Sequence, residues 1–167
     1  MLGSEKQGGI VDYPALVISS LERAPALIVP LVCEVPATIL KRRPKSNKWS
    51  AHEHACHLAT VHPVMSARLD LMLSDSHARI TPYFPDPQEE SGSLLKKDLN
   101  QEMERFSLDR QKLVERLRGL SAEDWQRTAE HGEYNHYSIF IMFRHLALHD
   151  MLHAYRIEEL LLKRDWE

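Results

Sequence analysis

Hydrophobic residues along this chain recur every three or four positions, which is the spacing of amphipathic α-helices. Four segments follow this pattern, at residues 12–35, 50–73, 93–117 and 138–163. In the third segment the charged residues fall on the side opposite the apolar ones. Ser121 begins a further short helical turn, and hardly any segment alternates as a strand does. We therefore predict an all-α four-helix bundle with short extra helical turns in the connections.

Single residues indicate where these helices begin and bend. Ser50, followed three residues later by Glu53, has the pattern of a capping box and predicts the start of the second helix. Pro30 lies inside the first segment, where a proline kinks or restarts a helix, so we expect that helix in two pieces. Pro63 is expected to bend the second helix about one turn beyond His57.

Composition and charge are those of an ordinary soluble globular protein, with 43% hydrophobic and 27% charged residues. We expect a flexible lead-in at residues 1–10 and a single domain at residues 11–167. The net charge of -3 offers no basic surface for nucleic acid or an anionic membrane, so neither partner is expected. Cys33 and Cys56 lie in apolar helical patterns, which predicts buried, reduced thiols and a cytoplasmic location.

Histidine is the residue type that stands out, with 10 among 167 residues. His145, His149 and His153 are spaced four apart in the last segment, so their imidazoles project from one stripe of a helix. A neutral imidazole carries a donor and an acceptor that both need partners in apolar surroundings. A divalent metal is such a partner, but it requires a further ligand from elsewhere in the chain.

The second segment offers histidines for that further ligand. His57 shares a helical face with Glu53 and the apolar Val61, which makes it the best inward candidate, and His54 is the second. His52 falls well around the helix from His57 and is expected to face solvent. Hydrogen-bonded core histidines are the alternative to a metal site.

Two stretches resemble the signatures of one family. Residues 49–58, WSAHEHACHL, resemble the W-S-x-x-E-x-x-x-H-L motif that opens the second helix of DinB/YfiT-like proteins. Residues 149–157, HDMLHAYRI, resemble the H-D-x-x-H-x-x-Q-I motif of their last helix, with Arg156 where glutamine is common. The resemblance implies an up-down-down-up four-helix bundle, often a homodimer, that holds one divalent metal through His57, His149 and His153.

A site of three imidazoles leaves coordination positions open, as in catalytic zinc sites. Zinc or nickel suits such ligands best, and iron or manganese is compatible. Family members with assigned activity include thiol-dependent S-transferases and isomerases, so the resemblance implies activation of a low-molecular-weight thiol towards a small-molecule substrate. One alternative is a metal-dependent hydrolase that uses metal-bound water. The other is a non-catalytic, metal-stabilised binding or stress-response protein.

Other candidate residues surround the proposed centre. Glu53 either orients a ligand imidazole, acts as a general base, or only closes the capping box. His145 is expected to line the pocket, with the roles of fourth ligand or proton shuttle left open, and His54 and Arg156 are expected beside it. Asp150 lies about 100° around the helix from His149 and is expected to bind a neighbouring helix or loop. Aromatic residues either line a substrate mouth or pack within their loops, among them Tyr83 and Tyr137.

Overall fold

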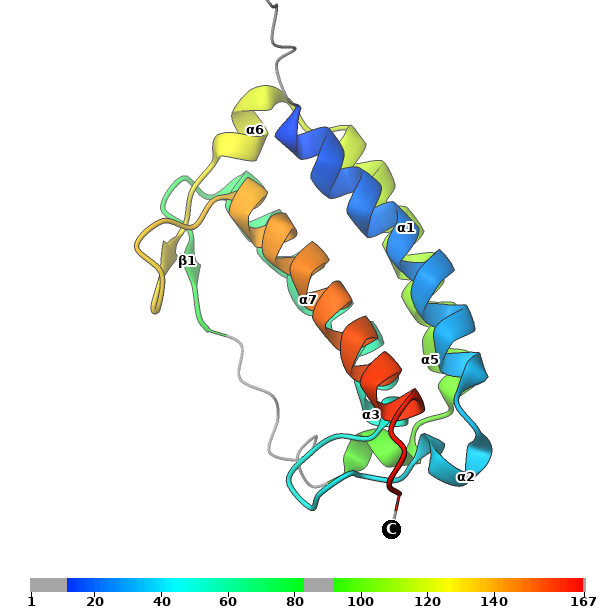
Figure 1. Cartoon of the computed structure of the whole chain (residues 1–167). Coiled ribbons are helices and arrows are strands. Elements are labelled where there is room, and N and C mark those ends of the chain that lie inside the picture. Colours follow the sequence, from blue (N-terminus) through cyan, green and yellow to red (C-terminus); the bar gives the residue numbers. More distant parts are fainter. Residues whose placement is uncertain (1–11, 83–91, 167) are drawn as a thin grey trace, which may run out of the picture.

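The computed structural model describes residues 12–82 and 92–166 and is a four-helix bundle (Figure 1). α1 and α7 run in one direction, whereas α3 and α5 run in the other, which is the predicted up-down-down-up order. α1 packs against α7 and α5, and α3 packs against the same two helices. The long helices are α1 (Tyr13–Glu34), α3 (Ala51–Ser74), α5 (Leu99–Arg118) and α7 (Ile139–Leu161).

Short elements fill the connections between the long helices. α2 (Ala37–Leu40), η1 (Ser93–Lys96) and α6 (Ala122–Gln126) are the helical ones. β1 (Arg79–Ile80) and β2 (Glu130–His131) form a two-stranded parallel ladder, to the left of α7 in Figure 1. The expected lead-in at residues 1–10 lies outside the described residues.

The helix starts follow from capping side chains. The Ser50 hydroxyl accepts a hydrogen bond from the Glu53 backbone N–H at 3.3 Å, and the Glu53 carboxylate accepts one from the Ser50 N–H at 2.9 Å, so the predicted capping box is confirmed. Ser138 caps α7 in the same way by accepting from the Ile141 N–H. These caps fix where the helices that carry the candidate histidines begin.

The prediction that the first helix is broken was wrong. α1 continues through both Pro25 and Pro30. Ala24, Ile28 and Val32 lie on one buried face of this helix, before, between and after the two prolines. Packing of that face against α5 and α7 stabilises the helix enough to offset the backbone hydrogen bonds that proline cannot donate.

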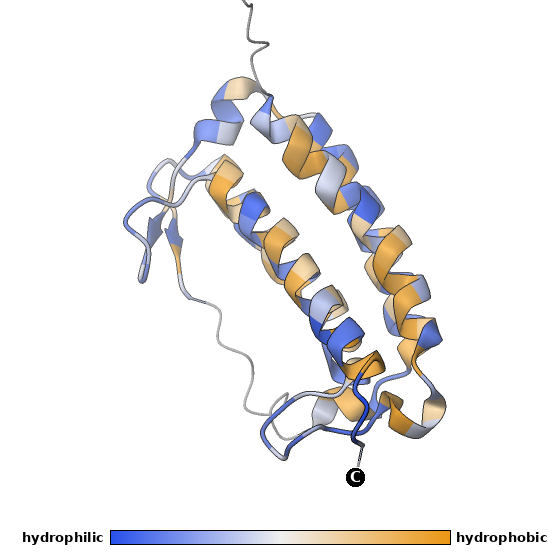
Figure 2. Cartoon of the chain, in the orientation of Figure 1, coloured by the Kyte–Doolittle hydropathy of each residue, from blue (hydrophilic) through white to orange (hydrophobic). Residues whose placement is uncertain are grey.

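Two apolar clusters form the core, one towards each end of the bundle. Figure 2 shows hydrophobic and hydrophilic positions alternating along the long helices. On α7 the first includes Phe143 and Leu146, and the second includes Ala154 and Ile157. Buried polar side chains lie between the two clusters along the same helices, among them Arg110 of α5 and Asp150 of α7. A polar layer therefore crosses the middle of the bundle.

Surface features test other expectations in part. Cys56 is buried as predicted, whereas the prediction for Cys33 was wrong, because this residue lies on an exposed side of α1.

Within residues 12–82 and 92–166, α1 is the single helix whose length and composition would allow it to cross a membrane, a test that core helices also pass. α7 exposes Leu148, Leu152 and Tyr155. The homodimer, the cytoplasmic location and the absence of membrane or nucleic-acid partners stay predictions.

Candidate metal centre

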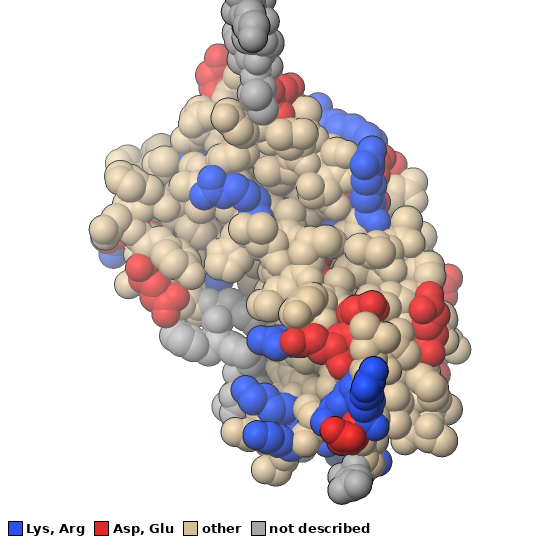
Figure 3. Space-filling model, in the orientation of Figure 1, with Lys and Arg blue, Asp and Glu red and all other residues tan. Residues whose placement is uncertain are grey.

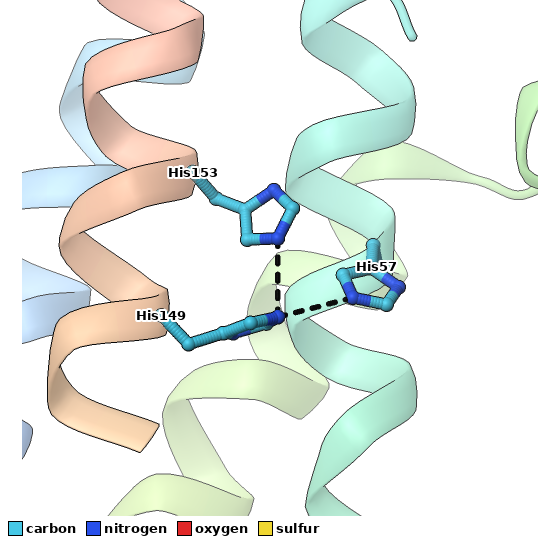
Figure 4. Close-up of side chains that lie close together, drawn as sticks. All are labelled: His57, His149 and His153. Atoms are coloured by element: carbon cyan, nitrogen blue, oxygen red, sulfur yellow. Dashed lines mark hydrogen bonds between the residues drawn. The ribbon is translucent and has the colours of Figure 1, made fainter. Parts of the chain in front are cut away.

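His57 of α3 meets His149 and His153 of α7 in the polar layer (Figure 4). The Nε2 atom of His149 lies 3.2 Å from Nε2 of His57 and 3.1 Å from Nε2 of His153. Candidate ligand atoms of all three residues lie within 4.8 Å of one another. Two nitrogens that bind one zinc ion at about 2.0–2.1 Å in tetrahedral geometry lie about 3.3 Å apart, so the cluster fits a metal of this size.

Local folding explains why these three residues converge. On α7 the four-residue spacing stacks His149 and His153 on one side, while Asp150, Ala154 and Ile157 are buried in the bundle. On α3 the capping box at Ser50 starts the helix. The rotation of α3 is set by its apolar residues Ala55, Leu58 and Ala59, which pack in the second core cluster and leave His57 towards α7.

Trp49, at the end of the loop before α3, covers the cluster on one side. Its ring centroid lies 4.8 Å from that of His57, 5.9 Å from that of His153 and 5.5 Å from that of His54. The sequence placed this tryptophan in a family motif but indicated no contact with the histidines. The indole excludes water from the imidazoles that it covers.

Burial keeps the three candidate ligands neutral. Burial, followed by the influence of neighbouring histidines, lowers the pKa of His57 to about 3. The pKa of His149 falls to about 4 and that of His153 to about 2, again chiefly through burial. Neutral imidazole is the form that binds a metal, so these side chains are ready to do so near neutral pH.

His54 contacts a candidate ligand directly. Its Nδ1 atom lies 2.8 Å from Nδ1 of His153, and the two ring centroids are 5.0 Å apart. If His153 binds a metal through Nε2, its Nδ1 carries the proton and donates it to His54 in a hydrogen bond. Such a bond fixes the tautomer and the orientation of a ligand imidazole. Burial lowers the pKa of His54 to about 4, so this acceptor stays neutral.

Glu53 is fully buried and does not lie among the candidate ligands. Its carboxylate accepts hydrogen bonds from Arg43 Nε at 3.1 and 2.9 Å and from the Ser50 hydroxyl at 3.0 Å. Burial raises the pKa of Glu53, but the bonds from Arg43 and Ser50 outweigh it and hold the pKa below its usual value. The sequence left three roles open for Glu53: orienting a ligand imidazole, acting as a general base, or closing the capping box. The contacts observed here are those of the capping box.

The remaining predicted site residues lie around the cluster. His145 is exposed one turn before His149, and its ring centroid lies 6.2 Å from that of Tyr134. Tyr137 is buried, with its ring centroid 4.5 Å from that of His131. Arg156 is half-exposed on α7 and pairs with Glu159 at 2.6 Å. Tyr83 lies outside the described residues.

His52 corrects one expectation from the sequence. It was expected to face solvent, but its side chain is buried and its Nε2 lies 3.1 Å from the Leu94 carbonyl oxygen. The connection that contains η1 packs over the start of α3 and covers this side of the helix. The spacing of residues within α3 does not predict that the connection with η1 covers His52.

A model of the DinB superfamily matches residues 20–157. The chain belongs to the DinB superfamily. A search of the solved structures finds YfiT from Bacillus subtilis, described as a probable metal-dependent hydrolase with an unusual four-helix bundle topology. The TM-score is 0.81 at 20% sequence identity, over 93% of this chain and 90% of that chain, and it shows the shared fold. A search of the curated proteins finds no match.

In this DinB-superfamily protein, one depression reaches the histidine cluster at His149, and a larger one lies beside Trp49 and His54, which contact the cluster. Beyond His149, one depression of about 150 Å³ is lined by His145, Tyr137 and Arg68 among other residues. On the other side, a depression of about 760 Å³ is lined by Trp49, His54 and Arg156, together with residues of the loop before α3. The predicted pocket residues that the structure describes therefore divide between the two sides of one centre.

Proposed function

We propose that this protein is an enzyme that depends on a divalent metal held by His57, His149 and His153. The observation that carries the proposal is the meeting of three neutral imidazoles from two helices, two of them buried and that of His149 half-buried, with nitrogens at the spacing of ligands to one ion. Three ligands leave further coordination positions for a reactant, as in catalytic rather than structural zinc sites. Zinc or nickel suits this ligand set best, and iron or manganese is compatible.

The chain's own residues orient and shield the centre. When bound, a divalent metal supplies the charge that lowers the pKa of a thiol or of water at an open position. With a metal on Nε2 of His153, His54 would accept a hydrogen bond from Nδ1 of His153 and hold that ring in place. Trp49 excludes water from one side, while His145 borders the approach on the other.

We infer that the nucleophile is a low-molecular-weight thiol, transferred to or acting on a small electrophilic substrate. The resemblance of the two histidine motifs to DinB/YfiT-like proteins supports this choice, because members with assigned activity use such thiols. Hydrolysis with water as the nucleophile is the second candidate. It is favoured by the likeness to YfiT, which is described as a probable metal-dependent hydrolase.

Metal analysis and a cobalt-substituted protein test the proposal. We expect one divalent metal per chain in the protein as isolated, and loss of that metal in His57→Ala but not in the control His136→Ala, which changes an exposed loop histidine. A metal content unchanged in His57→Ala excludes the proposed ligand set.

The same cobalt protein distinguishes the two nucleophiles. Addition of cysteine or another small thiol is expected to create a sulfur-to-cobalt charge-transfer band. Hydrolysis of model esters without any response to thiols favours the hydrolase instead. If neither occurs while metal strongly raises thermal stability, the protein binds its ligand without catalysis.

A further inference from the structure

The depression of about 760 Å³ beside Trp49 is large enough for a small organic molecule. Its lining comes from the loop before α3, from His54 of α3, and from Arg156, Glu159 and Leu160 of α7. We propose that this depression binds the carboxylate end of a small organic acid, with Arg156 and Lys48 as the recognising cations. The inference deepens the proposed function, on which it rests, by naming the class of substrate.

Positive charge exceeds negative charge in the lining. Three cations, Arg43, Lys48 and Arg156, face one carboxylate, Glu159, although the whole chain carries a net charge of -3. The charge of Arg43 is matched from behind by the buried Glu53. Figure 3 shows Lys and Arg side chains gathered at the end of the bundle where this loop lies. One positive charge is therefore left for a ligand.

Lys48 and Arg156 are both able to contact an anion. The Lys48 side chain makes no hydrogen bond or ion pair within the described part of the chain. Arg156 pairs with Glu159, but their side chains are 53% and 42% exposed, and such surface pairs are weak. A carboxylate can replace Glu159 at the guanidinium, because planar guanidinium binds carboxylate through two parallel hydrogen bonds.

The loop before α3, which forms one side of the depression, is held in place before any ligand binds. Arg43 is anchored to Glu53 of α3, and its Nη1 donates to the Ser46 carbonyl oxygen at 3.3 Å. Trp49, at the end of the same loop, packs on His57 and His153. A preformed site loses less conformational entropy when a ligand binds.

The lining also indicates that the anion is organic. Pro44, Trp49 and Leu160 offer apolar surface beside the cations, which suits a ligand with an apolar body. His54 lines the depression and contacts His153, so a ligand anchored here lies one imidazole ring away from a candidate metal ligand.

Binding of benzoate, the isosteric neutral benzamide and inorganic phosphate tests the inference, by calorimetry on metal-loaded protein. We expect benzoate to bind at least tenfold more tightly than benzamide and than phosphate. Arg156→Gln is expected to weaken benzoate binding about tenfold while leaving that of benzamide unchanged, because it removes one charge-assisted contact. Arg118→Gln is the matched control, since Arg118 is also 53% exposed and pairs with an exposed glutamate, and it should change nothing.

Equal affinities for benzoate and benzamide, or unchanged benzoate binding in Arg156→Gln, would overturn the inference. Tighter binding of phosphate than of benzoate would do so as well, and would identify a phosphate site. Metal analysis of the protein as isolated, with the same titrations repeated on chelator-treated protein, separates this inference from the proposed function. Charge-selective binding without any metal content contradicts the metal enzyme alone, whereas stoichiometric metal without charge selectivity contradicts the carboxylate site alone.

Discussion

Two buried polar clusters lie in the middle layer of this bundle, and they are built in opposite ways. In the first, Arg110 of α5 donates to the Asp150 carboxylate, to the Leu21 carbonyl oxygen at 2.9 Å and to His62 Nε2 at 3.3 Å. It thereby joins all four long helices. In the second, imidazoles of α3 and α7 face one another.

The difference separates a structural cluster from a binding site. Burial raises the pKa of the Asp150 carboxyl, and the Arg110 guanidinium opposes that rise, so each charge needs the other. The three candidate ligands have lowered pKa values and converge on a single point, where a cation fits. In the first cluster the charges pair with each other within the protein, whereas the role proposed for the second requires a metal.

Breaking the charged cluster should have the largest effect on stability. Asp150→Leu leaves Arg110 buried without its counterion, which is expected to lower the free energy of unfolding by about 3–5 kcal/mol. The double variant Arg110→Met/Asp150→Leu removes both charges and should recover most of that loss. Urea denaturation measures both. A double variant as unstable as Asp150→Leu would contradict this account of the cluster.

Breaking the histidine cluster should act through the metal instead. At a free zinc concentration of about 100 times Kd, a bound ion raises the free energy of unfolding by about 2.7 kcal/mol. His57→Ala should lose this gain, while His136→Ala, which changes an exposed loop histidine, should keep it. Thermal and urea denaturation with zinc or with chelator measure the difference. An equal zinc-dependent gain in His57→Ala would exclude His57 as a ligand.

The sequence predicted the histidine cluster better than the charged one. The four-residue spacing of His149 and His153 and the motif around His57 indicated these residues, and the structure brings them together. Asp150 was expected to bind a neighbouring helix, and its contact with Arg110 of α5 confirms this. Arg110 itself was grouped with the solvent-facing charges, although it lies four residues after the buried Phe106. Helical periodicity alone does not indicate when a buried charge has a partner on another helix.

Connections between helices were the other source of error. The burial of His52 depends on η1, which reaches it from a distant part of the chain. The anchoring of Glu53 by Arg43 joins α3 to the loop that precedes it, a contact that no pattern in the sequence indicated. Such contacts arise from tertiary packing, so local patterns predict the helices and their caps but not what covers them.

A smaller effect is expected at His54, which contacts the histidine cluster but is not one of its three candidate ligands. His54→Phe removes the acceptor of the His153 Nδ1 hydrogen bond and should lower metal affinity about 10–100-fold. His54→Asn keeps an acceptor on a short side chain and should restore part of that affinity. Competition with a chromophoric chelator measures both variants. If His54→Phe and wild type hold the metal equally well, His54 does not orient His153.

The pH dependence of stability should reveal a further difference, through His62 of the charged cluster. Burial, followed by the charges of Arg110 and Arg105, lowers the pKa of His62 to about 3. Below pH of about 6.5 the unfolded chain binds a proton at this residue that the folded protein does not bind. The free energy of unfolding should therefore fall as the pH drops towards 4, with a contribution from His62 of at most about 1.4 kcal/mol per pH unit.

His62→Gln isolates that contribution, because the glutamine amide oxygen can still accept from Arg110 Nε while it carries no titrating group. Other buried histidines destabilise the folded state on acidification in both proteins, so only the difference in slope between pH 4 and 6.5 belongs to His62. Urea denaturation of the metal-free proteins measures the two slopes. Equal slopes would show that His62 takes up a proton in the folded state. The imidazole of the charged cluster would then not stay neutral, unlike those of the histidine cluster.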